Sequence, residues 1–152
     1  MEGIIIKNQS NNYTVRTKKG IHVCKPRGRF RSDKIIPLVG DNVIIDDINN
    51  YLLEIKPRKN SLIRPTIANI DNAIIVTSVK EPNFDSNLLD KLLTIISYNN
   101  IEPIICLTKL DLLSKEEQIK IKEIISYYQK IGYKVVTNDD VKEIKKIIKD
   151  KI

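Results

Sequence analysis

One stretch constrains the fold more than any other: the apolar run Ile104–Leu107, followed directly by the polar tetrapeptide Thr108–Asp111. A continuous run of Ile and Leu without polar alternation is typical of a strand buried on both faces, as in parallel sheets. Ligands of such sheets bind just beyond the carboxyl ends of the strands. The tetrapeptide therefore lies where a ligand could bind. Four such residues are also compatible with a solvated turn before the next helix.

The side chains of this tetrapeptide suit a guanine base. Guanine presents its N1–H and its exocyclic amine side by side, and the carboxylate of Asp111 can accept from both. Adenine has no such pair of donors. The methylene stem of Lys109 can lie along a flat base while its ammonium stays in water. Thr108, Lys109, Leu110 and Asp111 are thus a candidate guanine-binding motif.

Residues 65–152 alternate between strand and helix patterns. Apolar runs with β propensity alternate with segments whose Leu and Ile recur at helical spacing, and Ser114–Glu117 has the sequence of a capping box. The order β–α–β–α–β–α predicts a parallel sheet with right-handed crossovers and helices on its faces, a three-layer α/β domain. The expected strands are 72–79, 101–107 and 133–136, and the expected helices start near 85, 114 and 140, the last one running to about 151.

The first 64 residues contain five short β-type runs separated by Gly and Asn turns, with no helical period. Five strands in about 60 residues fit a small barrel. The OB-fold is the expected choice because it commonly binds nucleic acid, and an SH3-like barrel is the structural alternative. The expected strands are 3–7, 13–16, 21–24, 42–45 and 51–55. We expect domains of 1–64 and 65–152, joined at the polar, basic run Arg58–Pro65.

The net charge of +7 lies entirely in the first 64 residues, which hold 13 Lys and Arg against 6 Asp and Glu. The remaining residues hold 13 of each sign, and all six arginines precede Pro65. Such asymmetry predicts that the first domain meets a polyanion, with RNA or DNA favoured over the simpler case of a solvated basic loop. The candidate RNA-binding residues are Lys25, Arg27, Arg29, Phe30 (as a stacking platform), Arg31, Arg58, Lys59 and Arg64.

Other features narrow the class of protein. Cys24, Cys106 and His22 are too few and too scattered for a metal cluster, and two distant cysteines suit a reducing cytosol. Neither a signal sequence nor an apolar run of about 20 residues is present. A phosphate-binding GxxxxGK[ST] loop is also missing, so these residues alone cannot hydrolyse GTP efficiently.

Several motifs together resemble one known family. They are Val39-Gly40-Asp41, the run Pro57–Pro65, Ala68–Asp71, Leu88–Lys91 and Thr108–Asp111. In this order, and following a basic barrel in the sequence, they resemble the N-terminal part of the ribosome small-subunit-dependent GTPase A family. Members of that family are bacterial circularly permuted GTPases. The resemblance covers nearly the whole chain. Three positions depart from the family pattern. The family usually has Asn at the position of Thr108 and commonly has Arg at the position of Lys91. A Ser-Ala type pair is expected where this sequence has Thr137-Asn138.

The resemblance implies a function and its partners. It implies a cytoplasmic, monomeric GTPase that matures the small ribosomal subunit, with GTP and Mg²⁺ as ligands and a barrel that contacts ribosomal RNA. Thr137 and Asn138 would form a second base loop, the phosphate loop would follow shortly after Ile152, and a zinc-binding domain would come later. Two alternatives stay open: a non-catalytic RNA-binding protein whose α/β domain holds no nucleotide, and a protein that binds an acidic protein surface.

Overall fold

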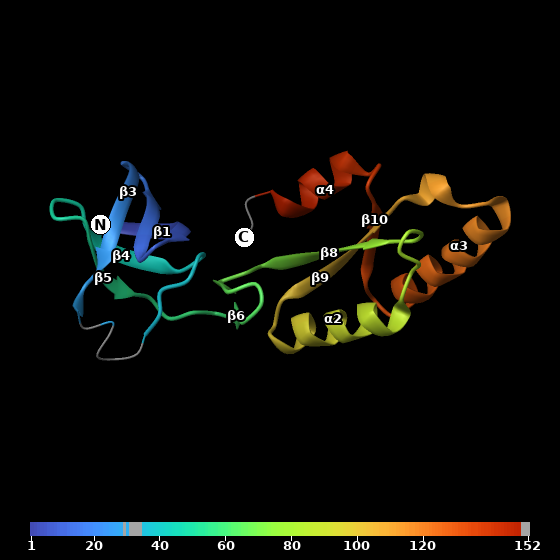
Figure 1. Cartoon of the computed structure of the whole chain (residues 1–152), viewed down its shortest axis with the longest axis horizontal. Coiled ribbons are helices and arrows are strands. Elements are labelled where there is room, and N and C mark those ends of the chain that lie inside the picture. Colours follow the sequence, from blue (N-terminus) through green and yellow to red (C-terminus); the bar gives the residue numbers. More distant parts are fainter. Residues whose placement is uncertain (29, 31–34, 150–152) are drawn as a thin grey trace. The chain divides into compact units, whose positions relative to one another are not determined.

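The computed structural model describes residues 1–28, 30 and 35–149 and divides into two compact units, Met1–Ile70 and Asp71–Ile152 (Figure 1). The first unit is built on β-strands, and the second combines a sheet with helices. Each unit is described by itself. Arg29 and Arg31, two of the predicted RNA-binding residues, lie outside the described residues.

The first unit is a closed five-stranded barrel. Its strand order, β1-β2-β3-β5-β4 and back to β1, is that of an OB-fold, which confirms the predicted class. The β3–β5 pair is parallel, and the other four pairs are antiparallel. The strands are β1 (Glu2–Gln9), β2 (Asn12–Thr17), β3 (Gly20–Pro26), β4 (Asn42–Asp46) and β5 (Tyr51–Ile55).

Alternating side chains fill the barrel, as the pleat of a strand requires. Val15 is fully buried, and the flanking Thr14 and Arg16 are not. The apolar core consists of Ile5, Tyr13, Val15, Cys24, Phe30, Val43, Ile45 and Leu52.

A small hairpin completes this unit where the sequence predicted a linker. β6 (Ser61–Leu62) pairs with β7 (Ile67–Ala68). The hairpin joins the barrel because Ala68 N–H donates to the Val39 carbonyl at 2.9 Å. Buried Asn69 donates from Nδ2 to the Gly40 carbonyl at 2.9 Å and accepts at Oδ1 from Lys59 N–H, also at 2.9 Å. Residues of three motifs that carried the family resemblance, Val39–Asp41, Pro57–Pro65 and Ala68–Asp71, therefore form one hydrogen-bonded junction.

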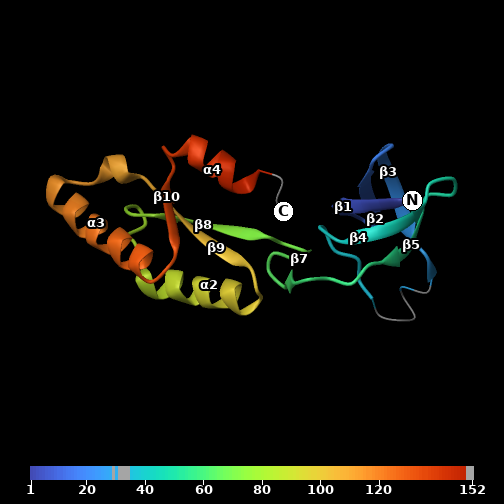
Figure 2. The ribbon, with the colours of Figure 1, turned by 180° about the vertical axis from the view of Figure 1, so that it is seen from behind.

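The second unit is built on a three-stranded parallel sheet, as predicted, and the strand order is β10-β9-β8 (Figure 2). Its strands are β8 (Asn72–Ser78), β9 (Glu102–Thr108) and β10 (Lys134–Thr137). The central strand β9 buries Ile104–Leu107 on both faces, as its continuous apolar sequence indicated. Its Ile104 and Cys106 pack with Val136 of β10 and Ile147 of α4 (Val141–Ile148).

Two further helices, α2 (Ser86–Tyr98) and α3 (Lys115–Lys130), lie across the sheet from α4 (Figures 1 and 2). The α2 helix is capped by Asp85, whose carboxylate accepts from Leu88 N–H at 3.1 Å. The predicted capping box at α3 is present: Ser114 and Glu117 exchange side-chain-to-backbone hydrogen bonds. None of the helices in the described part of the chain is long and apolar enough to cross a membrane.

Candidate functional site

The carboxyl ends of the three parallel strands bring both predicted base-reading loops to one edge of the sheet. Ser78 is in register with Thr108, and Leu107 is in register with Thr137. Asn138 N–H also donates to the Leu107 carbonyl at 3.1 Å, so the loop after β10 lies beside the end of β9. The third strand, β10, therefore neighbours the second, β9, and the two loops share one edge of the sheet.

The tetrapeptide Thr108–Asp111 turns sharply as it leaves the sheet. Thr108 is half-buried and donates from Oγ1 to the Thr77 carbonyl at 3.3 Å, and its own carbonyl accepts from Val79 N–H at 3.1 Å. Lys109 adopts the left-handed conformation (φ 62°, ψ 32°) and its ammonium donates to the Glu81 carbonyl. These contacts fix the start of the motif against the segment that follows β8.

Asp111 lies in the single 3-10 turn η1 (Leu110–Leu112), and its side chain is exposed. Across residues 1–28, 30 and 35–149, no hydrogen bond or ion pair engages its carboxylate. Both oxygens can therefore accept from a ligand. A carboxylate held at the carboxyl end of a central parallel strand has the chemistry needed for a guanine edge.

The second loop, Thr137–Asp140, is closed by the carboxylate of Asp140. Asp140 Oδ2 accepts from the backbone N–H and from the hydroxyl of Thr137, each at 2.9 Å. These two hydrogen bonds, the backbone one first, hold the pKa of Asp140 below its ordinary value. Asn138 and Asp139 are exposed at the tip of the loop. Asp140 does not cap α4 with its side chain, because that side chain serves the loop.

The position of Phe30 shows that its predicted role as a stacking platform was wrong. We expected its ring to be a platform for a stacked base, but the side chain is only 5% exposed and packs in the barrel core. A buried ring offers no free face to a base. Two nearby cations behave differently: Lys25, near the end of β3, and Arg27, just after it, are both exposed.

Arg58, also predicted to contact RNA, makes a structural ion pair. Its Nε and Nη2 donate to the two carboxylate oxygens of Asp41 at 2.7 and 2.8 Å, and Nη2 also donates to the Ile36 carbonyl at 2.8 Å. Asp41 is completely buried and additionally accepts from Leu38 N–H at 2.7 Å. The side chains of Lys59 and Arg64 lie on the exposed surface.

The sequence did not reveal one ion pair near the tetrapeptide, which joins Lys80 to Glu117. Lys80 Nζ lies 3.0 and 3.1 Å from the two carboxylate oxygens of Glu117, in the first turn of α3. The capping role of Glu117 was predicted from Ser114–Glu117, but nothing in the sequence links it to a lysine 37 residues away.

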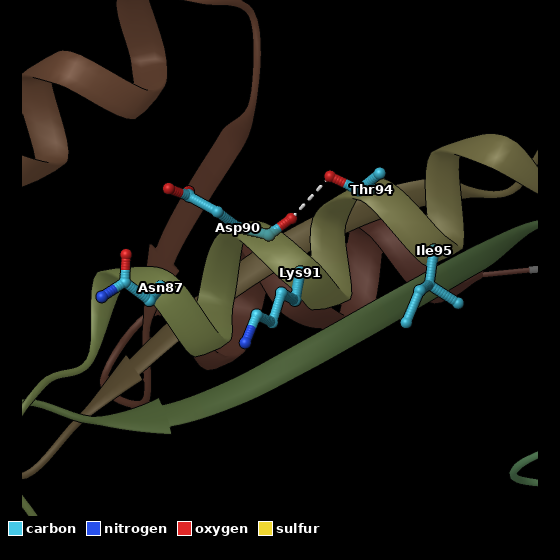
Figure 3. A pocket seen from close by; sticks show the side chains of 5 residues that line it. All are labelled: Asn87, Asp90, Lys91, Thr94 and Ile95. Carbon is cyan, nitrogen blue, oxygen red and sulfur yellow. Dashed lines mark hydrogen bonds between the residues drawn. The ribbon is translucent and has the colours of Figure 1, made fainter.

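An open groove runs along α2 and is lined by Asn87, Asp90, Lys91, Thr94 and Ile95 (Figure 3). Asp90 accepts from the hydroxyl of buried Tyr128 at 2.7 Å, which joins α2 to α3. Burial, followed by this carboxylate, raises the pKa of Tyr128. None of the predicted base-reading residues lines this groove, and its Asp90 helps to pack α2 against α3. In the described ranges, no three His, Cys, Asp or Glu side chains gather as metal ligands.

Comparison with known proteins decides the family. A profile described as RsgA GTPase matches residues 55–152, and one described as RsgA N-terminal domain matches residues 2–51. The chain belongs to the RsgA GTPase family. A relative from Caldanaerobacter subterraneus subsp. tengcongensis, named small ribosomal subunit biogenesis GTPase RsgA, is 42% identical over 100% of this chain and 53% of its own length. A relative from Oceanobacillus iheyensis, named small ribosomal subunit biogenesis GTPase RsgA 2, is 50% identical over 88% of this chain and 47% of its own length.

Two solved structures share the fold. The crystal structure of YloQ, described as a circularly permuted GTPase, matches with a TM-score of 0.85 and 40% identity, covering 99% of this chain and 57% of YloQ. YjeQ from Thermotoga maritima matches with a TM-score of 0.86 and 29% identity over the same shares. The chain thus spans about half the length of the curated relatives it matches.

Proposed function

We propose that this chain supplies the RNA-binding barrel and the guanine-reading half of a GTPase that acts in biogenesis of the small ribosomal subunit. The family, with relatives that carry this function in their names, supports the proposal. The observation that carries it is the unengaged carboxylate of Asp111 at the end of the central parallel strand, beside the Thr137–Asp140 loop. On this proposal, residues 1–64 form the RNA-binding domain and residues 65–152 form the first half of the GTPase domain.

Each base-reading residue has a separate task. Asp111 accepts from N1–H and the exocyclic amine of guanine, and the stem of Lys109 covers one face of the ring. Thr108 fixes the turn through its hydroxyl bond to Thr77, in place of the Asn that is usual in the family. The loop at Thr137 and Asn138 lies on the O6 side of the base, and Leu110 spaces Lys109 from Asp111.

GTP hydrolysis requires parts that the 152 residues do not contain. The sequence has no GxxxxGK[ST] loop to cradle phosphates and provide the hydroxyl that holds Mg²⁺. We therefore propose that these residues alone bind guanine nucleotides weakly and do not turn over GTP. We propose that the full catalytic site, acting with Mg²⁺ in the cytoplasm, and a zinc-binding domain are carried by longer members of the family.

The exposed cations of the first unit are the proposed contacts to ribosomal RNA of the small subunit. Lys25 and Arg27 are exposed near the end of β3, and Arg58, Lys59 and Arg64 are exposed in the segment after β5. Arg29 and Arg31 remain in the proposal on sequence grounds. Arg side chains suit phosphate contacts because their planar donors can bind two oxygens at once.

A nucleotide titration of the 152-residue chain tests this function against the alternative of a non-catalytic RNA-binding protein. Amide resonances would be followed while GDP or ADP is added. We expect GDP alone to shift the amides of Thr108–Asp111 and Thr137–Asn138, with an affinity in the millimolar range. Identical responses to GDP and ADP, or shifts elsewhere only, would favour an α/β unit that holds no nucleotide.

A further inference from the structure

The segment that follows β8, residues 79–82, contacts the structure on both sides of the guanine-reading turn. Upstream of Asp111, Lys109 donates its ammonium to the Glu81 carbonyl, and Val79 N–H donates to the Thr108 carbonyl at 3.1 Å. Downstream of Asp111, Lys80 reaches Glu117 in α3. The turn that carries Asp111 is thus fastened to one short segment at both of its ends.

The carboxylate of Glu117 makes two kinds of contact. Its Oε2 accepts from Ser114 N–H at 2.7 Å, which closes the capping box, and lies 3.0 Å from Lys80 Nζ. These donors, Ser114 N–H first and then Lys80, hold the pKa of Glu117 below its ordinary value. Most surface ion pairs stabilise little, partly because two long side chains must be ordered. The cap already orders Glu117, so less conformational freedom is lost when Lys80 binds it.

We infer that Lys80 and Glu117 are positioning residues for guanine reading, because their ion pair fixes the turn that presents Asp111. This inference rests on the proposed function. One carboxylate that accepts from two adjacent donors must be aligned within about 0.5 Å and 10–20°. The turn itself has local hydrogen bonds, Leu112 N–H to Lys109 and Leu113 N–H to Leu110, each at 3.2 Å. Such turns are easily displaced unless their flanks are held.

The chain offers matched variants for a test. Lys80→Met removes the charge and keeps most of the stem, Lys80→Arg restores a cation, and Glu117→Gln keeps a cap acceptor but loses the charge. Lys134→Met is the control, since the Lys134–Glu143 pair (3.1 Å) is similarly exposed, lies in the same unit and does not contact residues 108–117. Unchanged amide spectra in the barrel and in β9 would confirm that each variant folds.

The first measurement is amide hydrogen exchange at Leu112 and Leu113 without nucleotide. We expect Lys80→Met and Glu117→Gln to speed exchange there about threefold to fivefold, the scale of a half-exposed ion pair, and to leave Ile104–Leu107 unchanged. Lys80→Arg should stay within about twofold of the parent chain, as should Lys134→Met. Exchange in Lys80→Met that matches Lys134→Met would overturn the inference.

The second measurement is the ratio of affinities for GDP and IDP, which lacks the exocyclic amine. Lys80→Met should lower the preference for GDP by roughly threefold to fivefold, and Lys80→Arg should restore it. Equal weakening for both nucleotides would show a merely structural role and would overturn the inference. A parent chain with no preference for GDP would instead contradict the proposed function, and the exchange measurement would still decide whether Lys80 fixes the turn.

Discussion

Arg58 and Asp41 form a two-pronged ion pair, with Nε to Oδ1 at 2.7 Å and Nη2 to Oδ2 at 2.8 Å. Asp41 is fully buried at the end of the β3–β4 connection, and Arg58 follows β5. The pair therefore joins two segments that are separated by 17 positions in the sequence. Arg58 therefore has a structural role in the barrel unit, in addition to its place among the predicted RNA contacts.

Replacing Arg58 should destabilise the barrel. Arg58→Ala leaves a buried carboxylate without its cation, which costs about 3 kcal/mol in comparable pairs. Urea unfolding followed at barrel amides would measure the loss. Arg64→Ala is the control, because that exposed side chain should change the free energy of unfolding by less than about 0.5 kcal/mol. Equal stability of the two variants would show that the Asp41 pair contributes nothing.

Gly40 should tolerate no side chain. Its φ is +89°, and a Cβ there would lie 2.0 Å from the Ala68 carbonyl oxygen. Gly40→Ala must break the junction between the barrel and the β6–β7 hairpin, with a loss above about 2 kcal/mol. Gly20→Ala isolates the conformational part, because Gly20 also has positive φ (+137°) but open space around it. We expect that control to lose about 1 kcal/mol; thermal unfolding that ranks Gly20→Ala as the more damaging would contradict the account.

The arginine-rich connection should set the salt dependence of RNA binding. Removing Arg27, Arg29 and Arg31 together should weaken binding to small-subunit ribosomal RNA and flatten the slope of log K against log salt by about 2–3 units. Filter binding at several salt concentrations would measure the slope. The triple variant of Lys142, Lys145 and Lys146, exposed on α4, removes the same charge from the other unit. If both triple variants changed the slope equally, net charge rather than a surface on the barrel would govern binding.

The Thr137–Asp140 loop should open at acid pH. Because the folded-state pKa of Asp140 is lowered, its stabilising effect is complete above its unfolded pKa of roughly 4 and is lost as the pH falls through the folded value. Thr137→Val removes the hydroxyl donor but keeps the backbone donor, so the pKa should rise only part of the way. Carbon-13 titration of the carboxyl groups measures both values. A pKa that does not move in Thr137→Val would show that the hydroxyl bond has no role.

Periodicity and local motifs predicted most of the architecture. Continuous burial of Ile104–Leu107 and the Ser114–Glu117 capping box are encoded within a few residues, so they could be read directly. The positions of Thr108–Asp111 and Thr137–Asn138 at one sheet edge followed from the rule that parallel strands share the direction of their ends. These parts of the site depend on local pattern and topology alone.

The errors and omissions concern contacts between distant segments. The ring of Phe30 packs in the barrel core although Phe30 lies outside the barrel strands, which no local pattern indicates. The ion pair of Arg58 with Asp41 was missed, since the sequence does not show that these two residues lie side by side. The partner of Lys80 is likewise set by tertiary structure, since many acidic side chains were available and only Glu117 lies within reach of the ammonium among the described residues.

The central claim, that Asp111 reads guanine, is tested most directly by exchanging its acceptor for a donor. Xanthine carries a carbonyl where guanine carries its exocyclic amine, so the amide of an Asp111→Asn variant can donate to xanthine but can no longer accept from guanine through both oxygens. Amide-detected titrations with GDP and XDP compare the parent chain and the variant. We predict that the parent prefers GDP and the variant prefers XDP, with shifts at Thr108–Asp111 in both; the same preference for GDP in both proteins would contradict the account.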